Sequence, residues 1–424
     1  MTRDVVPELE ARGLVFDVSD RDALSEALAS GPVTFYCGYD PTGVSLHAGS
    51  LVPLSLMRHL TLGGHRPIGL VGGATGMVGD PSGKSEERNL LDEATLEKNT
   101  EAVKGQLERL LGKSVTMVNN ADWTRPVSVL DFLRDVGKHM TVNYMLSKDS
   151  VKSRIENREQ GISYTEFSYM LLQAFDFVHL AAAFDCRLQV GGSDQWGNIT
   201  CGIELQRKMG REPVFGLVGP LLTTASGGKF GKTAAGTSVW LDRDMTSPYR
   251  FYQYWINAED ADVERYLKMF TLVPLGEVAA IVAEHADDPG RRNAQRRLAH
   301  ELTTWVHGED SARAAEAVSE ILFGGAITKD TPAEALELLA VETPTSDVPK
   351  TAVEEGWPVV DALVETGLSK SKGAARRLLG QGGVYVNNVR SDDPERQLVI
   401  DDVAAGAIIV LRSGKKTYHL VRLV

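Results

Sequence analysis

The chain has 424 residues, of which 43% are hydrophobic and 24% charged, a balance typical of a folded globular protein and not of a disordered or fibrous one. This length predicts two or three domains. The net charge of −12 argues against indiscriminate binding of polyanions, although residues 350–424 carry 11 Lys and Arg against 9 Asp and Glu, which favours a terminal domain with a different kind of partner.

The cysteines and the apolar runs exclude further classes of protein. Cys37, Cys186 and Cys201 form no CxxC pair, so neither a disulfide framework nor a cysteine zinc site is expected, and a reducing cytoplasm fits best. No uninterrupted apolar run approaches the ~18 residues of a membrane span, and the N-terminus lacks the core of a signal peptide. We therefore expect a cytoplasmic protein with no membrane partner and no metal centre.

The first half of the chain predicts an α/β domain. Short apolar runs alternate with helical patterns between residues 33 and 220, which indicates βα units around a mostly parallel sheet. The predicted strands are 33–37, 68–71, 114–118 and 187–190, and the predicted helices are 50–62, 93–111, 165–183 and one that begins near Ser193 or Asp194.

The second half changes character twice. The pattern is almost wholly helical from about 246 to 323, and three prolines among turn-forming residues at 341–358 predict a linker. Helices are then predicted at 359–366 and 370–380, a hairpin with an Asn-Asn turn at 382–389, and strands at 407–411 and 416–423. The predicted division is 1–225, 226–340, a linker at 341–357, and 358–424.

The first candidate site is the segment YDPTGVSLHAGS at 39–50, between a predicted strand and a predicted helix. Ligands bind at the carboxyl ends of strands in open α/β sheets, and a helix N-terminus offers free N–H groups to phosphate. Thr42 and His47 could donate to phosphoryl oxygens, and Gly49 allows close backbone approach. The alternative is a turn in which Ser50 caps the helix and His47 lies on the surface.

The glycine-rich segment at 72–85 invites comparison with a P-loop. The pattern GxxxxGK[ST] needs glycine where Val78 stands, so we reject that interpretation. What remains is a glycine-rich loop with Asp80, Lys84 and Arg88 available to a ligand, or a connection with solvated charges.

A polar stripe marks the predicted helix at 165–183. Tyr169, Gln173 and Asp176 fall within ~60° of one another on one face, among apolar neighbours. Leaving a buried polar group unsatisfied costs roughly 1–3 kcal/mol, so the stripe predicts either a bound polar ligand or hydrogen bonds to a neighbouring helix.

Two more segments have the composition of nucleotide-binding loops. In GGSDQWGN at 191–198, Asp194 could accept from ribose hydroxyls or could cap the helix. In KFGKT at 229–233, two lysines suit the charge that develops on pyrophosphate during its displacement, although such a loop can also be merely exposed.

Taken together, these motifs resemble the bacterial-type tyrosyl-tRNA synthetases. HAGS at 47–50 is similar to the HIGH signature of class I aminoacyl-tRNA synthetases, KFGKT is similar to KMSKS, and GGSDQWGN and YTEFSY (164–169) are similar to stretches of the tyrosyl branch. The resemblance spans nearly the whole chain. It implies a Rossmann-like nucleotide-binding catalytic domain with a parallel sheet, then an α-helical anticodon-binding domain, then a small α+β S4-like RNA-binding domain.

The resemblance also implies an activity and its partners. A ligase of this family activates L-tyrosine with ATP, accompanied by Mg²⁺ and without a prosthetic group, and then transfers tyrosine to the 3′ end of tRNA(Tyr). The family is homodimeric and cytoplasmic. One residue departs from the family pattern, because Ser50 stands where histidine or asparagine is usual, and we expect a modest effect on ATP affinity.

The resemblance assigns residues to four roles. Tyrosine would be bound by Tyr36, Asp80, Tyr169, Gln173, Asp176, Gln189 and Gln195. ATP would be bound by Cys37, Gly38, Asp40, His47, Gly49, Ser50, Gly192, Asp194 and Lys232. The catalytic groups would be Thr42, His47, Lys84, Arg88, Lys229, Lys232 and Thr233. Transfer RNA would be contacted by Arg207, Lys208, Arg291, Arg292, Lys370, Lys372, Arg376, Arg377 and Lys415.

Two other hypotheses compete with this one. The related tryptophanyl enzyme is disfavoured because an indole offers one N–H and no phenol for Tyr36 and Asp176 to recognise. An RNA-binding protein that has lost ligation is disfavoured because His47, Asp194 and Lys232 are all retained.

Overall fold

The structure, a computed structural model, describes residues 2–82, 91–156, 161–228, 230–233 and 236–424. The chain forms two compact units. Unit 1 contains Met1–Asp242 and Glu259–Ala294, and unit 2 contains Arg243–Ala258 and Gln295–Val424. The boundaries predicted from the sequence stay predictions.

A six-stranded sheet organises unit 1. Its order is β1-β6-β5-β2-β3-β4, and every neighbouring pair is parallel except β1 with β6. The chain steps outward from β2 to β4 on one side and through β5 to β6 on the other, so the carboxyl ends of β2 and β5 form a topological switch point. The strands are β1 (Asp17–Val18), β2 (Thr34–Tyr39), β3 (Arg66–Val71), β4 (Thr116–Asn119), β5 (Cys186–Gly192) and β6 (Phe215–Gly219).

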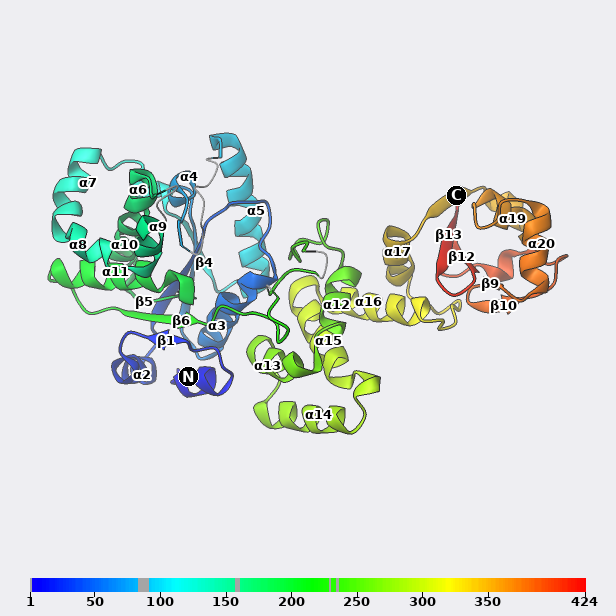
Figure 1. The fold of residues 1–424 in the computed structure, drawn as a ribbon, viewed down its shortest axis with the longest axis horizontal. Helices are drawn as coiled ribbons and strands as arrows, with labels where there is room; N and C mark the ends of the chain where they lie inside the picture. Colours follow the sequence, from blue (N-terminus) through cyan, green and yellow to red (C-terminus); the bar gives the residue numbers. More distant parts are fainter. Residues whose placement is uncertain (1, 83–90, 157–160, 229, 234–235) are drawn as a thin grey trace. The chain divides into compact units, whose positions relative to one another are not determined.

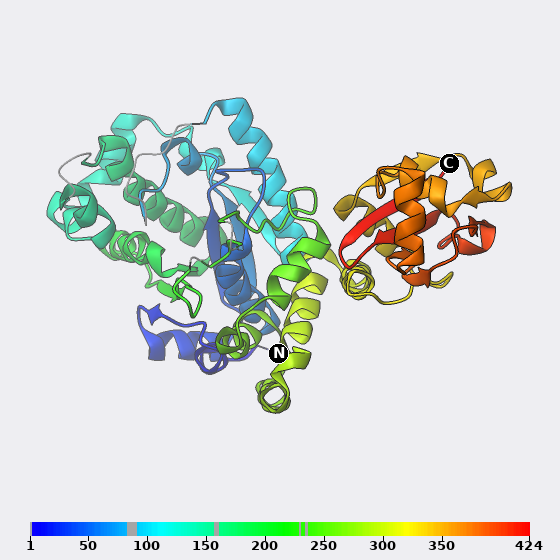
Figure 2. The same cartoon turned by 45° about the vertical axis from the view of Figure 1, so that its right-hand side comes forward.

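Helices cover both faces of this sheet. Helices α3 and α5 lie on one face, and α10 and α11 lie on the other, as both ribbon views show (Figure 1, Figure 2). The helices of unit 1 are α1 (Val6–Ala11), α2 (Arg21–Ser30), α3 (Leu51–Leu62), α4 (Thr75–Val78), α5 (Glu93–Leu111), α6 (Ala121–Thr124), α7 (Val129–Asp135), α8 (Val142–Leu146), α9 (Asp149–Glu156), α10 (Tyr164–Phe184), α11 (Trp196–Lys208), α13 (Asp260–Phe270) and α14 (Leu275–Asp287). Short 3₁₀ turns lie at Ala48–Ser50, Gly137–His139, Ser193–Gln195 and Pro289–Arg291.

Helix α10 is the long apolar helix that the sequence predicts. Its start is set by a capping box in which the Ser163 side chain accepts from the backbone N–H of Glu166 and the Glu166 carboxylate accepts from that of Ser163. Among the described residues it is the one helix long and apolar enough to cross a membrane by length and composition. It packs on α11 and β5, and its buried Tyr169 and Asp176 give it a polar stripe, so we interpret it as a core helix.

Unit 2 begins with helices and ends with a small sheet. The helices are α12 (Pro248–Ile256), α15 (Asn293–His307), α16 (Glu309–Leu322), α17 (Ala333–Glu342), α18 (Lys350–Glu354), α19 (Val359–Glu365) and α20 (Lys372–Gly380). The sheet has the order β10-β9-β12-β13-β7, and β8 pairs with β11 beside it. The strands are β7 (Thr345–Val348), β8 (Trp357–Pro358), β9 (Val384–Val386), β10 (Val389–Ser391), β11 (Gln397–Leu398), β12 (Ile408–Ser413) and β13 (Thr417–Leu423), with a 3₁₀ turn at Ile400–Asp402.

The end of α16 is joined to the terminal sheet by side chains. Asn388, in the β9–β10 turn, donates to the carbonyl oxygens of Ile321 and Gly325, both at 2.8 Å. The Tyr418 hydroxyl lies 3.1 Å from the Ile321 oxygen and 3.2 Å from that of Leu322. Ile321 and Leu322 lie in the last turn of α16, where carbonyl groups lack intrahelical partners, and Gly325 lies beyond the helix. The Ile321 oxygen also accepts from the Gly324 N–H at 3.0 Å.

The predicted α/β class and its main elements are confirmed. Helix α5 matches its prediction at both ends, and the predicted strands correspond to β2 to β5, each to within a few residues. The Asn-Asn turn has positive φ at Asn387 and Asn388, as a tight hairpin turn requires. The stretch 341–357 differs from the expected linker, because it contains α18 and β7, and β7 pairs in parallel with β13.

Candidate functional site

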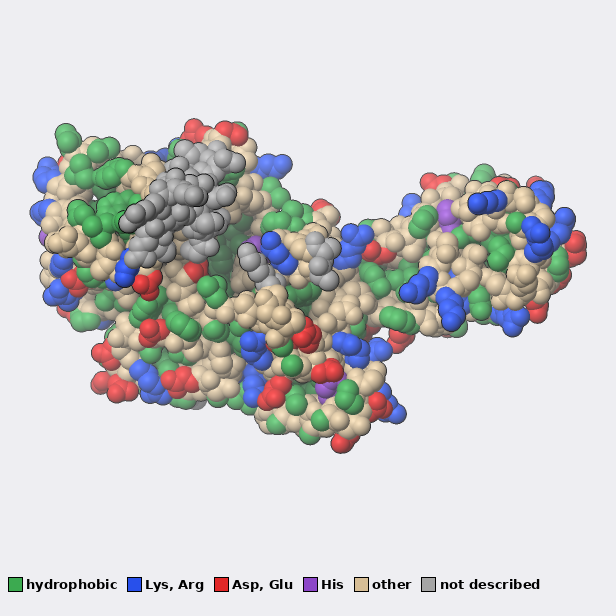
Figure 3. All heavy atoms as spheres, in the orientation of Figure 1, with side chains coloured by type: hydrophobic (Ala, Val, Ile, Leu, Met, Phe, Trp, Pro, Cys, Tyr) green, Lys and Arg blue, Asp and Glu red, His purple; other side chains and the backbone are tan. Residues whose placement is uncertain are grey.

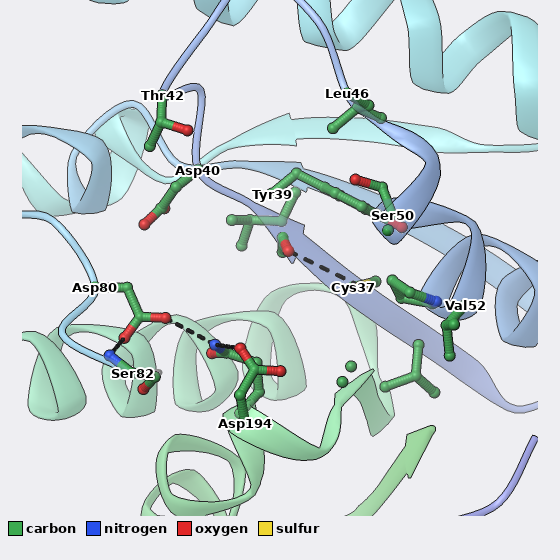
Figure 4. A pocket seen from close by; sticks show the side chains of 18 of the residues that line it. Cys37, Tyr39, Asp40, Thr42, Leu46, Ser50, Val52, Asp80, Ser82 and Asp194 are labelled. Carbon is green, nitrogen blue, oxygen red and sulfur yellow. Dashed lines mark hydrogen bonds between the residues drawn. The ribbon is translucent and has the colours of Figure 1, made fainter. Parts of the chain in front are cut away.

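A pocket of about 460 Å³ opens at the carboxyl ends of β2 and β5 (Figure 4). This is the switch point at which an open α/β sheet binds its ligands. The predicted site residues that line it are Tyr36, Cys37, Gly38, Asp40, Thr42, His47, Gly49, Ser50, Asp80, Tyr169, Gln173, Asp176, Gln189, Gly192, Asp194 and Gln195. Lys84, Arg88 and Lys229 lie outside the described residues.

The most buried polar residues that line the pocket are Tyr36, Gln189 and Asp176. The Tyr36 hydroxyl and the Gln189 Oε1 are fully buried and have no hydrogen-bond partner among the residues that the structure describes. Burial, and then the charge of Asp176, raises the pKa of Tyr36 well above its ordinary value of 10. Because buried polar groups in folded proteins are almost always paired, this end of the pocket is suited to a polar ligand group.

Asp176 is fixed by two donors that the sequence analysis did not single out. Asn120 Nδ2 donates to Asp176 Oδ2 at 3.0 Å, and Trp123 Nε1 donates to Asp176 Oδ1 at 2.9 Å. The Trp123 ring stacks on His179 with its centroid 4.4 Å away. Burial raises the pKa of Asp176 to about 7, although both hydrogen bonds act to lower it.

Asn120 was missed because its role depends on the fold. It directly follows β4, and a polar residue at the carboxyl end of a parallel strand is the signal that could have indicated it. The side chain is fully buried, its Oδ1 accepts from the Ala74 N–H at 2.7 Å, and its Nδ2 also donates to Thr75 Oγ1 at 3.0 Å. Every polar atom of Asn120 is therefore engaged, which fixes its orientation.

The hydrogen-bond chain continues from Asn120 through Thr75 to Asp40. Thr75 Oγ1 donates to Asp40 Oδ1 at 2.7 Å, and the Tyr169 hydroxyl donates to Asp40 Oδ2 at 2.8 Å. Burial, and then the charge of Asp40, raises the pKa of Tyr169 well above 10, so its hydroxyl stays protonated and donating.

A second group of acidic and amide side chains faces Asp40 across the pocket (Figure 4). Gln195 Nε2 donates to Asp80 Oδ2 at 2.7 Å and to Asp194 Oδ2 at 3.0 Å, and the Ser82 N–H donates to Asp80 Oδ1 at 2.9 Å. Burial raises the pKa of Asp194. Four aspartates thus line one pocket, which gives it a negative potential suited to a cationic group.

His47 has a defined tautomer. Its Nδ1 accepts from the Gly49 N–H at 3.0 Å, so the proton lies on Nε2. Burial, and then the charge of Lys232, lowers the pKa of His47, so the ring is a neutral donor at physiological pH. A Cβ at position 49 would lie 2.7 Å from His47 Cε1, which explains why glycine stands there.

The KFGKT segment lies against the HAGS segment. The Val239 N–H donates to the Gly231 oxygen at 2.9 Å, and the Ala48 N–H donates to the Val239 oxygen at 2.8 Å. Gly231 has φ of +79°, and a Cβ there would lie 3.0 Å from the Gly49 nitrogen. Phe230 lines the pocket, whereas Lys232 and Thr233 do not.

Ser50 also lines the pocket, and its side chain makes no capping hydrogen bond to α3. This removes the interpretation of Ser50 as a capping residue and leaves its hydroxyl to the pocket. A contact with ATP stays a prediction.

None of the residues predicted to contact tRNA is among those that line the pocket. Arg207 makes two 2.8 Å contacts to Glu204 on α11, and Lys208 lies 3.5 Å from the same carboxylate. Arg291 pairs with Asp288 at 3.0 Å, and Lys372 pairs with Asp361 at 2.7 Å. The exposed residues at the terminal sheet and its helices are Lys370, Lys372, Arg376, Arg377 and Lys415, and Arg292 is half-buried. Their roles stay predictions.

Comparison with protein families gives two matches. Residues 28–324 match the family described as class I tRNA synthetases for tryptophan and tyrosine, and residues 340–421 match the C-terminal domain of tyrosine–tRNA ligases. The chain is 49% identical to the tyrosine–tRNA ligase of Rhodopirellula baltica, covering all of this chain and 97% of that one. It is also 49% identical to the tyrosine–tRNA ligase of Geobacillus stearothermophilus over 99% of both chains.

Solved structures resemble the same part of the chain. A C-terminally truncated mitochondrial tyrosyl-tRNA synthetase from Aspergillus nidulans superposes with a TM-score of 0.69 at 34% identity, covering 76% of this chain and 94% of that one. A tryptophanyl-tRNA synthetase from Encephalitozoon cuniculi shares the fold with a TM-score of 0.54 at 13% identity, covering 78% of this chain and 89% of that one.

Proposed function

The chain belongs to the class I tRNA synthetases for tryptophan and tyrosine and is a tyrosine–tRNA ligase, and from this premise we propose how its pocket performs the two steps. The observation that carries the proposal is the buried Tyr36 hydroxyl, which has no hydrogen-bond partner in the described part of the chain, beside the doubly hydrogen-bonded Asp176. Together they form a recognition site for one phenolic hydroxyl.

The substrate tyrosine is held at both ends. Its phenol donates to the Asp176 carboxylate and accepts from Tyr36, which satisfies the group that is otherwise buried unpaired. Its ammonium group lies near Asp80, Tyr169 and Gln173, where several carboxylates favour a cation. Gln189 completes the inner wall, and Gln195, held between Asp80 and Asp194, faces the substrate carboxylate.

A tryptophan substrate fits this chemistry less well. An indole N–H can donate to Asp176 but cannot accept from Tyr36, so one buried hydroxyl would stay unpaired. Phenylalanine would leave the Tyr36 hydroxyl unpaired and would place an apolar ring edge against the Asp176 carboxylate, which keeps only its bonds to Asn120 and Trp123. Tyrosyl-tRNA synthetases are a known example of such discrimination without editing, at about 10⁵ against phenylalanine.

ATP occupies the part of the pocket lined by the segment 37–50. We assign its ribose to Cys37, Gly192 and Asp194, with Gly38, Asp40, Gly49 and Ser50 lining the same subsite. The neutral His47 donates from Nε2 to the phosphate oxygens together with Thr42. Lys232 and Thr233 approach from the KFGKT side. Mg²⁺ travels with ATP on its phosphates, and no described residues form a group of three metal-binding side chains, so we assign it no protein ligand.

The first step is an in-line displacement. The tyrosine carboxylate attacks the α-phosphorus, an O–P bond forms, the bond to the β-phosphate oxygen breaks, and pyrophosphate leaves with the negative charge. His47 and Lys232 stabilise charge on the phosphates, and no enzyme nucleophile is required. The terminal ribose hydroxyl of tRNA(Tyr) then attacks the carbonyl carbon of the adenylate, and AMP leaves.

The tRNA partner is assigned to basic residues outside the pocket. Arg207 and Lys208 on α11 belong to the same unit as the pocket and are assigned to the acceptor arm. The exposed cluster Arg376 and Arg377 on α20, together with Lys370, Lys372 and Lys415, is assigned to phosphate contacts of the terminal domain, and Arg291 and Arg292 to the anticodon side.

We assign the homodimer to an exposed apolar surface on α7 and α8. Val129 and Leu130 are 74% and 78% exposed, and Leu133, Val142 and Leu146 on the same two helices are 46%, 59% and 37% exposed. Hydrophobic side chains gather over this part of unit 1 (Figure 3). Contiguous exposed apolar surface of this kind is typical of protein interfaces. The dimer operates in the cytoplasm, where tRNA is charged.

Tyrosine-dependent exchange of radiolabelled pyrophosphate into ATP tests the function. We expect exchange with tyrosine and none with tryptophan or phenylalanine at equal concentration. Exchange with tryptophan would contradict the assignment, and no exchange with any amino acid would favour an RNA-binding protein without ligase activity.

A further inference from the structure

One face of α13 contacts the segment that leads into KFGKT. Asp262, Arg265, Tyr266 and Phe270 are spaced at i, i+3, i+4 and i+8, so they share one side of the helix. All four belong to unit 1, as does the pocket. We call this surface the α13 face.

Its first contacts are polar. Asp262 is almost fully buried, and its Oδ2 accepts from the Ala225 N–H at 2.8 Å. Its Oδ1 accepts from Arg265 Nη2 at 2.6 Å, and the same nitrogen donates to the Thr223 oxygen at 2.7 Å. A buried carboxylate held by a backbone N–H and a guanidinium is a charge-assisted arrangement, stronger than a neutral pair.

Its remaining contacts are aromatic. The Phe230 ring stacks on Phe270 with centroids 5.5 Å apart and planes 16° apart, and it lies 5.4 Å from the Tyr266 ring. Phe230 is also a lining residue of the pocket. The α13 face therefore contacts the segment near its start, at Thr223 and Ala225, and again at Phe230.

The next residues lie beside the segment that lines the ATP subsite. Gly231 lies against the Gly49 backbone, and the charge of Lys232 acts on His47 strongly enough to contribute to its lowered pKa. A displacement of Phe230 would shift Gly231 and Lys232 with it, because backbone links allow little slack over one or two residues.

The carboxyl end of α13 is itself anchored. The buried Arg12 guanidinium donates to the carbonyl oxygens of Lys268, Thr271 and Val273 at 3.1–3.2 Å. Lys268 lies in the last turn of α13, where carbonyl groups lack intrahelical partners, and Thr271 and Val273 follow directly after the helix. The α13 face is thus fixed to the body of unit 1 and can serve as a reference surface for the segment that it contacts.

We propose that the α13 face positions Lys232 at the ATP phosphates, with Asp262 as a positioning residue for tyrosine activation. Asp262 touches no substrate. It acts through the Ala225 backbone, and its loss removes the acceptor of the Ala225 N–H while the contacts of Thr223 and Phe230 remain. The inference rests on the proposed role of Lys232 at the phosphates.

The test compares Asp262→Ala with Glu264→Ala. Glu264 is the matched control, because its substitution removes one carboxylate from the same helix, paired there with Lys268 and not with the segment. We expect Asp262→Ala to lower kcat for pyrophosphate exchange by about tenfold or more, the factor of one charge-assisted hydrogen bond, with tyrosine affinity unchanged. Glu264→Ala should stay within about twofold of the wild type. Asp262→Asn should recover part of the loss, because its single amide oxygen can accept from the Ala225 N–H but not from Arg265 as well.

Three measurements keep the outcomes distinct. Equilibrium binding of tyrosine reports whether unit 1 is folded, and equal losses of tyrosine affinity and exchange in Asp262→Ala would overturn the proposal in favour of a structural role. A wild-type exchange rate in Asp262→Ala together with slow exchange in Lys232→Ala would overturn the positioning role of Asp262 and leave the role of Lys232 intact. Wild-type exchange in Lys232→Ala would overturn the role of Lys232 itself. If Asp262→Ala does not fold, Phe270→Leu replaces it, with the same expected loss of kcat.

Discussion

Asp176 is predicted to make the free protein less stable as the pH rises towards neutrality. Burial raises its pKa from the ordinary 3.8 to about 7, so between these values the unfolded chain has lost the Asp176 proton while the folded chain retains it. The free energy of unfolding should then fall by about 1.4 kcal/mol per pH unit, or about 4 kcal/mol over the whole window, with no further change above pH 7.

The substitution Asp176→Asn isolates this effect. An amide does not titrate, so the stability of the variant relative to the wild type should increase between pH 4 and pH 7 and level off above. The size of the stability difference at any one pH is less informative than its change with pH. The introduced amide would face the donors of both Asn120 and Trp123 with only one acceptor, which adds a constant destabilisation.

Urea unfolding of both full-length proteins at pH 4.5 to 8.5 measures the difference, followed by tryptophan fluorescence and circular dichroism. Tyrosine should reduce the slope for the wild type, because the phenolic O–H stabilises the ionised carboxylate. The same variant should lose at least about tenfold in kcat/KM for tyrosine, the worth of one hydrogen bond to a charged group. A stability difference that is constant across the pH range would refute the reasoning.

Four further variants test the other parts of the proposal. Tyr36→Phe should lower the preference for tyrosine over phenylalanine in pyrophosphate exchange by about tenfold, since one of two phenol-recognising groups is lost, and an unchanged preference would assign recognition elsewhere. Leu130→Asp should convert the dimer into a monomer in sedimentation velocity, because it places a charge in the apolar surface, and a persistent dimer would exclude that surface. The double variant Arg376→Ala and Arg377→Ala should raise KM for tRNA and weaken its salt dependence while leaving exchange intact, whereas an unaltered salt dependence would count against phosphate contacts. Ser50→Asn should change the KM for ATP by about two- to threefold, and no change would argue against a ribose contact.

The α/β fold was predictable from local patterns wherever these patterns are strong. Helix α5 begins after Asp92, whose side chain accepts from the Thr95 N–H, and ends at Gly112 with φ of +81°. Both ends are therefore set by residue types that can be recognised in the sequence. Strand β6 was missed because two of its five residues are glycine, which lowers β propensity.

The linker prediction shows how proline can mislead. Pro344 and Pro349 flank β7, and two prolines so close together favour a loop. Strand β7 lies at the edge of its sheet, where a missing N–H costs no ladder hydrogen bond, so proline is tolerated beside it.

The site was predictable where its residues cluster in short motifs. Asn120 and Trp123 belong to no such motif, and their role follows from the packing of β4 beside β3 and of α10 on the sheet. The contacts of the α13 face could not be predicted from local sequence patterns either, since Asp262 and Phe270 contact residues about 40 positions earlier in the chain.

The capping of α16 by Asn388 and Tyr418 has a consequence for truncated chains. A protein ending before residue 340 would keep α16 but would lose the side-chain donors to the Ile321 and Leu322 oxygens, and the Ile321 oxygen would keep only its bond to the Gly324 N–H. Its final turn should therefore fray, and its amides should exchange faster with deuterium than in the full chain, while the amides at the start of the helix keep their protection. The terminal region is in this sense part of the folding unit of α16, in addition to its proposed contacts with tRNA.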